Sequence, residues 1–166
     1  MEYIDILDKN RKSLNKIIPR GSNLKENEFF QSAEIWIINS KNQLLIDQRS
    51  INKSHPNLWE CPGGCTIAGE TTIQTIKREV FEEIGINIKN HTPILLGTKI
   101  FKNQFVDIYG LRLNNLKIED LKLQQEEVQN AKFVSENELE HMINTKEIIP
   151  SVSERYYFVK DKFNNI

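Results

Sequence analysis

The 166-residue sequence contains no uninterrupted apolar run near the roughly 18 residues that a membrane-spanning helix needs. Its charges nearly balance, with a formal net charge of -1, so general attraction to nucleic acid or to an anionic membrane is not expected. The first ten residues carry Glu2, Asp5 and Asp8 and lack the basic-then-apolar layout of a secretory signal. We therefore expect a cytoplasmic protein that binds neither membranes nor nucleic acid polymers.

Cysteine is scarce as well. The two cysteines, Cys61 and Cys65, lie four positions apart, which does not make a disulfide framework. A zinc site that used both of them with His55 would lack a convincing fourth ligand. We interpret them as reduced thiols beside a turn at Gly63-Gly64. The length suggests one domain over residues 1–166, and we find no internal repeat or linker that would divide it.

Hydrophobic patterning predicts a mixture of strands and helices. The expected strands cover residues 3–7, 33–38, 43–48, 94–100, 105–113 and 131–134, and the expected helices cover 71–84, 136–142 and 151–163. Residues 1–30 are interpreted as an N-terminal strand-and-loop extension, and Trp36 and Trp59 as core residues. The elements interleave without regular βαβ spacing. This favours an α/β (α+β) fold with a mixed sheet and helices on both of its faces.

The clearest helix extends from Thr71 to Ile84. Thr71 or Thr72 can cap its start, and Gly85 can end it. Apolar residues recur along it at steps of three and four, at Ile73, Ile76, Val80 and Ile84. We expect this stripe to pack on the sheet.

The opposite face of that helix is acidic. Glu79, Glu82 and Glu83 stand at i, i+3 and i+4 and are therefore neighbours on the helix surface. Three such carboxylates repel one another, and Arg78 cannot neutralise all of them. A hard divalent cation can, because Mg²⁺ accepts a few carboxylate oxygens and keeps waters or phosphates as its other ligands. A solvated acidic face is the alternative.

The surrounding residues favour the metal interpretation. Gly64 is followed by five residues and Glu70, then by seven residues and the run Arg78-Glu79-Val80-Phe81-Glu82-Glu83-Ile84-Gly85-Ile86. Over residues 64–86 this spacing matches every fixed position of the Nudix box, and the chain therefore resembles the Nudix hydrolase superfamily. The resemblance implies an α/β/α sandwich with a mixed sheet flanked by helices. It also implies Mg²⁺- or Mn²⁺-dependent hydrolysis of a small diphosphate substrate.

The resemblance further assigns roles within the box. Glu79 and Glu83 are expected to bind the metal, with Glu82 and the backbone carbonyl of Gly64 as further ligands. Arg78 is then expected to orient the glutamates through a salt bridge. Glu70 would support Arg78 in turn, because an oriented ligand binds better than a free one.

The general base and the phosphate-binding groups are less well defined. One of the box glutamates can act as the base, and some Nudix families use a glutamate on a distant loop instead. Glu127, in the run Gln125-Glu126-Glu127-Val128, is the best such candidate here, and a solvated acidic turn before a strand is the alternative. Arg49 and Lys53 are candidates for binding substrate phosphates. The alternative for Arg49 is an ordinary surface charge, and the alternative for Lys53 is an ordinary loop residue.

Outside the box, the first half of the chain resembles Nudix proteins related to isopentenyl-diphosphate isomerases. The motifs are Ile6-Leu7-Asp8-Lys9-Asn10, Arg20-Gly21, Ile35-Trp36-Ile37-Ile38-Asn39 and Gln48-Arg49-Ser50 with Lys53, Pro56 and Trp59. The catalytic Cys-Gly-His run of true isomerases is replaced by Gly63-Gly64-Cys65. Their metal-binding histidine is replaced by Phe30-Gln31. We therefore predict a hydrolase from an isomerase-like branch.

The leading hypothesis is cleavage of a nucleoside diphosphate derivative or a related organic pyrophosphate. An isopentenyl-diphosphate isomerase and a non-catalytic, nucleotide-sensing module are the alternatives. Specificity is expected to reside in the loops 50–57 and 113–129, where no motif identifies the substrate. A homodimer is compatible with the resemblance, with the N-terminal strand pairing with or swapping into a second copy.

Overall fold

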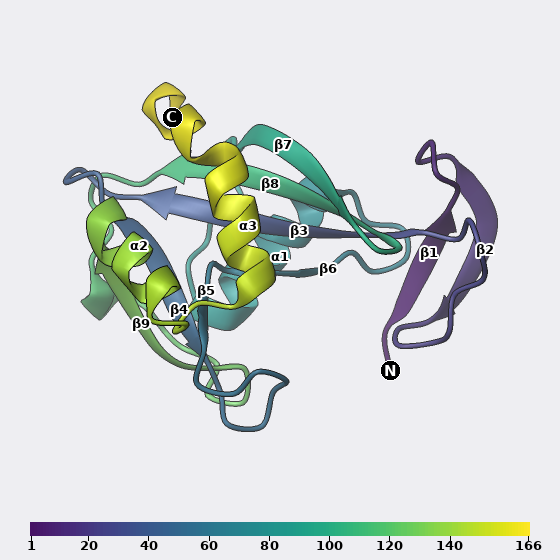
Figure 1. Ribbon diagram of the computed structural model, residues 1–166, viewed down its shortest axis with the longest axis horizontal. Coiled ribbons are helices and arrows are strands. Elements are labelled where there is room, and N and C mark those ends of the chain that lie inside the picture. Colours follow the sequence, from purple (N-terminus) through teal and green to yellow (C-terminus); the bar gives the residue numbers. More distant parts are fainter.

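The computed structural model describes residues 1–166 (Figure 1). Its strands are β1 (Tyr3–Leu7), β2 (Ser13–Pro19), β3 (Phe30–Ile38), β4 (Leu44–Arg49), β5 (Trp59–Glu60), β6 (Gly63–Cys65), β7 (Ile94–Phe101), β8 (Gln104–Arg112) and β9 (Val128–Val134). Its helices are α1 (Thr72–Ile84), α2 (Glu136–Asn144) and α3 (Pro150–Val159), with short 3-10 helices η1 (Ile118–Asp120) and η2 (Lys160–Asn165). None of these helices has the length and apolar character needed to cross a membrane.

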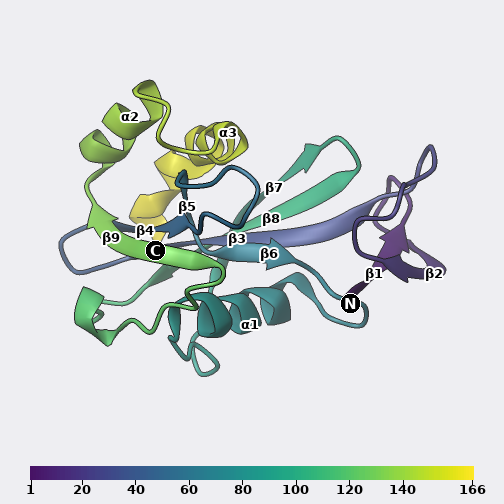
Figure 2. The ribbon, with the colours of Figure 1, turned by 90° about the horizontal axis from the view of Figure 1, so that it is seen from below.

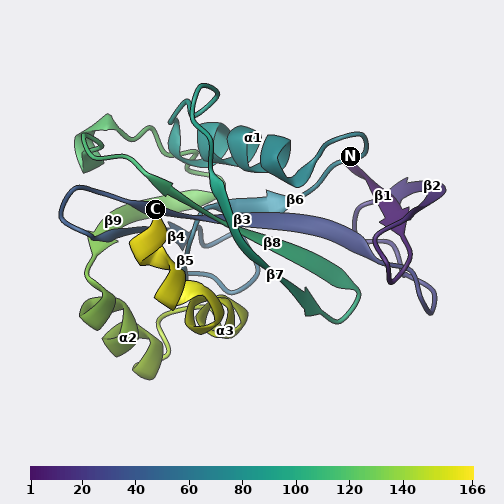
Figure 3. The same cartoon turned by 90° about the horizontal axis from the view of Figure 1, so that it is seen from above.

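The main sheet is mixed. Its strands follow the order β5-β4-β3-β8-β7, with β6 paired to β3 and β9 paired to β4. The β3–β8 pair is parallel, and the other pairs are antiparallel. Figure 2 shows α1 on one face of this sheet and α2 and α3 on the other, and Figure 3 shows the same layers from the opposite side. The predicted mixed sheet with helices on both faces is confirmed.

The side chains of β3 point alternately to the two faces of the sheet and so contribute to two layers of the core. Trp36 points to the layer under α2 and α3, where it packs with Tyr156, while Ile35 and Ile37 point to the layer over α1. Successive residues of a strand face opposite sides, so one strand supplies both layers. Trp36 is fully buried and Trp59 is 8% exposed, which confirms their predicted place in the core.

The predicted helix 151–163 ends at Val159 and continues as the 3-10 helix η2, and the short strand β5 was not predicted. Two further differences concern the N-terminal segment and the glycine pair. The strand at 3–7 pairs with an unpredicted strand, β2, in a separate two-stranded sheet that lies at the far end of the molecule from α2 (Figure 1). None of the residues of β2 is buried, and its apolar residues do not alternate with polar ones along the strand. Gly63-Gly64 is not a turn but begins strand β6, because its backbone pairs with Ala33 and Glu34 of β3.

A buried carboxylate ties the N-terminal hairpin to the main sheet. Asp107 on β8 accepts two hydrogen bonds of 2.8 Å from the Arg11 guanidinium and one each from Thr98 and Thr72. Burial by itself raises the pKa of Asp107, but these hydrogen bonds outweigh it and hold the pKa below its usual value.

Replacing Asp107 by asparagine is therefore expected to lower the free energy of unfolding at pH 7 by about 2 kcal/mol. A depressed folded-state pKa stabilises the protein above the unfolded-state pKa of about 3.9, and this stabilisation is lost as pH falls through the folded-state value. The difference between the two proteins should shrink towards pH 3. Urea unfolding at both pH values measures it, with Asp161→Asn as an exposed control. A difference that is the same at both pH values would contradict this account.

Candidate functional site

Helix α1 begins and ends as its sequence predicts. Thr71 caps the helix by accepting the Gln74 N–H, and the Gln74 side chain accepts the Thr71 N–H in return. Gly85 ends the helix in the left-handed region at φ 76°. Ile76, Val80 and Ile84 are fully buried against the sheet, as expected. The glutamates do not lie on the face opposite this stripe, as predicted, but beside it, since Glu83 is buried like Ile76 and accepts the Gly63 N–H. The fixed ends and the buried stripe therefore hold these carboxylates toward β6.

The two glycines of β6 bring its backbone close to both neighbouring elements. A Cβ atom on Gly64 would lie 2.0 Å from Oε1 of Glu79, and a Cβ on Gly63 would lie 2.4 Å from the carbonyl oxygen of Ala33. The Gly63 N–H donates to Oε2 of Glu83 at 3.2 Å. Only residues without a side chain allow α1 and β3 to approach the same strand this closely.

A cavity of 160 Å³ lies over β6 and α1, and no hydrophobic residue lines it. It brings together seven of the nine predicted site residues: Lys53, Gly64, Arg78, Glu79, Glu82, Glu83 and Glu127. Its other lining residues are Glu2, Arg20, Gly63 and Gln124. Of the two remaining site residues, Glu70 lies behind Arg78, and Arg49 lies in an adjoining cavity.

Arg78 is the centre of a charge network on α1. Its Nε donates to Glu70 at 2.9 Å, and its Nη1 lies 2.9 Å from Glu79 and 3.1 Å from Glu82. Its Nη2 also donates to the carbonyl of Cys65 on β6. The guanidinium therefore links the helix carboxylates to the glycine strand, and Glu70 holds it from the other side.

Glu83 is the most buried carboxylate of the box, at 5% exposed. Burial, then the neighbouring charges of Glu79 and Glu60, raise its pKa to about 8, and burial also raises the pKa of Glu79. The Lys53 ammonium lies 3.8 Å from Glu83 and forms an ion pair with Glu127. The positive charge of Lys53 therefore does not fully compensate the carboxylate charges around Glu83.

The residues present suit a hard divalent cation. No three acidic, histidine or cysteine side chains converge on a single point, because Glu79 and Glu82 turn to Arg78 while Glu83 turns to Gly63. The available donors are nevertheless all oxygen, from the carboxylates and the backbone of Gly64, which lines the same cavity, and this is the set that Mg²⁺ and Mn²⁺ prefer. The buried, raised-pKa carboxylates would gain most from a positive ion.

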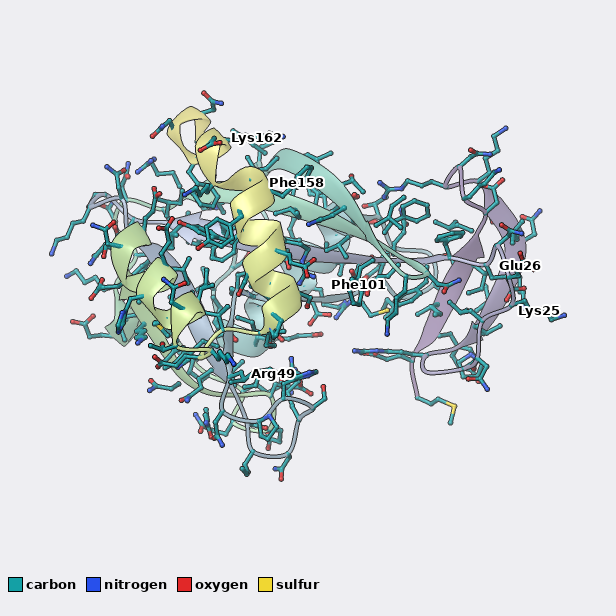
Figure 4. The ribbon with its side chains drawn as sticks, viewed as in Figure 1. Lys25, Glu26, Arg49, Phe101, Phe158 and Lys162 are labelled. Carbon is teal, nitrogen blue, oxygen red and sulfur yellow. The ribbon has the colours of Figure 1, made fainter.

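A larger cavity of 520 Å³ adjoins the first and shares Arg20, Lys53, Gly63 and Gly64 with it. Figure 4 shows two residues that line it, with Arg49 below the N-terminal end of α3 and Phe101 to the right of that end. The Arg49 guanidinium is already held by Glu60 at 2.5 Å and by Ser54. The Arg49 side chain is therefore held by Glu60 at the edge of the larger cavity, whereas Lys53 lines both cavities.

Sequence reasoning missed several residues of the site. Arg20 reaches both cavities from the N-terminal segment, and Glu34 and Arg155 line the larger one. Asp47 and Glu60 are paired across β4 and β5, and the charge of Glu83 contributes, after burial, to raising the pKa of Asp47. A charged residue inside the strongly apolar run of β3 was the available signal for Glu34. Asp47 gives the same signal after the apolar start of β4, and Arg20 stands in the Arg20-Gly21 motif. Glu60 and Arg155 have no such local signal.

The cysteines and aromatic residues fall mainly in the core. Cys61 and Cys65 are free thiols, and burial raises the pKa of Cys65 to about 11. They are therefore poor nucleophiles. Phe105 and Tyr109 are buried, while Phe101 is 41% exposed and borders the larger cavity.

The chain is similar to known proteins over most of its length. The NUDIX domain family matches residues 29–154. An uncharacterized Nudix hydrolase of Listeria monocytogenes is 37% identical over 99% of this chain and 95% of its own length. An isopentenyl-diphosphate Delta-isomerase of Enterobacter is 26% identical over 69% of this chain and 64% of its own. The crystal structure of DR0079 from Deinococcus radiodurans superposes with a TM-score of 0.73 at 22% identity, covering 87% of this chain and 90% of that one.

Proposed function

Because this chain belongs to the NUDIX family, we propose that it is a pyrophosphohydrolase that cleaves a small organic diphosphate in the polar cavity over β6 and α1. The observation that carries this proposal is the convergence of the box carboxylates, Gly64, Lys53 and Glu127 on one cavity. Arg20 of the N-terminal segment lines the same cavity, which supports our proposal that residues 1–166 form one domain.

Glu79, Glu82, Glu83 and the carbonyl of Gly64 would hold Mg²⁺ or Mn²⁺. Such an ion, when bound, neutralises phosphate oxygens and lowers the pKa of a water molecule. Arg78 keeps Glu79 and Glu82 pointed toward β6, and Glu70 keeps Arg78 in place. The lack of a side chain at Gly64 lets Glu79 reach the strand.

Lys53 and Glu127 supply the remaining chemistry. Lys53 is paired with Glu127 and Glu83, and its flexible ammonium can turn to a substrate phosphate as a point charge. Glu127, whose side chain is 41% exposed, would then accept a proton from the attacking water. Water attacks phosphorus, the bridging P–O bond breaks, and two phosphate-bearing products leave.

Replacing Glu127 by glutamine tests its role as the base. The turnover number is expected to fall by about a hundredfold, because an amide cannot accept the proton, while Mn²⁺ affinity changes by less than about threefold. The measurements are kcat and equilibrium Mn²⁺ binding. Glu126→Gln, at the exposed neighbouring position, should retain full activity. If activity and metal affinity fall together in the Glu127 variant, Glu127 is a metal ligand.

The substrate is proposed to be a nucleoside diphosphate derivative. The isomerase relatives favour isopentenyl diphosphate as the second candidate. Against it, Gly63-Gly64-Cys65 lacks the catalytic cysteine and histidine of the isomerases, and the nearby Cys65 thiol is buried with a raised pKa. A sensing module without turnover is the third candidate.

The test is a hydrolysis screen with Mg²⁺ against nucleoside diphosphate sugars, dinucleotides, nucleoside triphosphates and isopentenyl diphosphate. Glu82→Gln and Glu83→Gln serve as inactive variants. Phosphate-bearing products from one substrate class, absent in both variants, support hydrolysis. Conversion of isopentenyl diphosphate to its allylic isomer supports the isomerase instead. Tight binding of a nucleotide without any product supports the sensing module.

A further inference from the structure

A buried ion pair lies on the α3 side of the larger cavity. Arg155, in the second turn of α3, donates from Nε to Oε2 of Glu34 on β3 at 2.7 Å. The two side chains are 13% and 6% exposed, and both residues line the cavity. Neither belongs to the Nudix box, and the proposed hydrolysis at α1 makes no use of them.

Both partners keep unused hydrogen-bonding capacity. Arg155 makes no hydrogen bond to the protein through Nη1 or Nη2, so its planar fork remains open on the cavity side. Oε1 of Glu34 is buried without a partner, apart from the weak S–H donor of Cys61 near the carboxyl. Buried, unsatisfied polar groups are destabilising, so a fold that keeps them commonly uses them.

The pair lies one strand away from the proposed reaction site. Glu34 is the register partner of Gly63, and the Gly63 N–H donates to Glu83. The two cavities also share Gly63 and Gly64. A diphosphate held over β6 would therefore extend its organic group from the carboxylates of α1 toward Arg155.

We propose that Arg155 is a specificity-determining residue that binds acceptor atoms on the organic group of the diphosphate substrate, with Glu34 as its positioning residue. This inference rests on the proposed function. Glu34 compensates the guanidinium charge, so the pair suits an uncharged polar group better than another phosphate. A sugar or a nucleobase carries such acceptors, and a prenyl chain carries none. The covered Oε1 of Glu34 meets the ligand only after a side-chain rotation, so Arg155 is the primary contact.

The test measures binding without turnover. The probes are methylene-bridged analogues, whose P–CH₂–P linkage is not hydrolysed: α,β-methylene-ADP, α,β-methylene-UDP, the ribose derivative without a base, and the isopentenyl derivative. Calorimetric titration in Mg²⁺ gives a Kd for each. We expect the nucleoside analogues to bind at least about tenfold more tightly than the isopentenyl analogue, the scale of a hydrogen bond to a charged donor. The ribose derivative shows whether the sugar or the base supplies the acceptors.

The decisive variant is Glu34→Gln with Arg155→Met, because replacing both partners leaves no unpaired buried charge. The ratio of Kd values between isopentenyl and nucleoside analogues should fall to near one. Glu154→Gln, an exposed position on the same helix, is the matched control and should retain the ratio. If the double variant does not fold by circular dichroism, Arg155→Lys decides, since it keeps the charge and loses the planar fork.

Equal affinities in the wild type, or an unchanged ratio in the deciding variant, overturn the proposal. A uniform weakening of all probes also overturns it, because a purely structural role would act on all of them alike. Another outcome is that the wild type hydrolyses no substrate while the deciding variant still loses the preference for nucleoside over isopentenyl analogues. In that case the proposed hydrolysis fails and the proposed role of Arg155 stands. If hydrolysis occurs and the ratio persists in the variant, the hydrolysis stands and the recognition fails.

Discussion

Replacing Glu83 by glutamine is expected to lower the turnover number by about a thousandfold, because the amide keeps the shape of the side chain and removes a charge that holds the metal. Glu83 is the box carboxylate whose charge is most deeply buried, and it accepts the N–H of Gly63 directly beside the cavity. Glutamine can still accept that hydrogen bond through its amide oxygen. The variant therefore separates the charge of Glu83 from its packing.

The Glu83→Gln variant is expected to lose activity without losing stability. Without metal, its unfolding temperature should equal or exceed that of the wild type, because the uncharged amide avoids burying a carboxylate among other carboxylates. The rise in unfolding temperature that Mg²⁺ causes in the wild type should largely disappear, since a ligand stabilises only the state that binds it. Thermal unfolding with and without Mg²⁺, beside kcat, measures both effects.

Glu119→Gln, an exposed substitution in η1, serves as the control and should match the wild type in both measurements. A Glu83→Gln protein that unfolds at a markedly lower temperature without metal would show that the carboxylate mainly supports the fold. A variant that keeps its turnover would remove Glu83 from the proposed metal site.

The two glycines of β6 are expected to respond to alanine in different ways. At Gly63 the new Cβ would lie 2.4 Å from the Ala33 carbonyl and 2.8 Å from Cα of Glu34, both backbone atoms of β3. The strands must then separate, and we expect a loss of about 3 kcal/mol in the free energy of unfolding. At Gly64 the three atoms nearest to the new Cβ all belong to the Glu79 side chain, whose flexible end can move.

Gly64→Ala should therefore cost less than about 1 kcal/mol of stability while lowering kcat by about a hundredfold, because Glu79 is displaced from the site. Urea unfolding and turnover of the two variants, measured side by side, test the contrast. Gly69→Ala is a useful control, since its Cβ would meet no atom within 4 Å and only its φ of +85° opposes the change. Equal losses of stability at Gly63 and Gly64 would contradict the separation of their roles.

The unpredicted parts of the molecule share a physical cause. Strand β2 has no buried face that would impose an alternating pattern, and it forms because the chain turns at Arg11 and pairs with β1. The glycines of β6 resemble a turn in sequence, since nothing local shows that β3 lies beside them. Glu34 and Arg155 are 121 positions apart, and only the docking of α3 on the sheet joins them.

The sequence alone determined the arrangement of the carboxylates that are proposed to bind the metal. The spacing of the Nudix box places its glutamates on one face of α1, because the helical period makes residues three and four apart into neighbours, and the caps at Thr71 and Gly85 are local. The tertiary structure decided what surrounds that face. The second cavity, the entry of Lys53 and Arg20, and the open fork of Arg155 depend on contacts between distant segments, and such contacts leave no periodic trace along the chain.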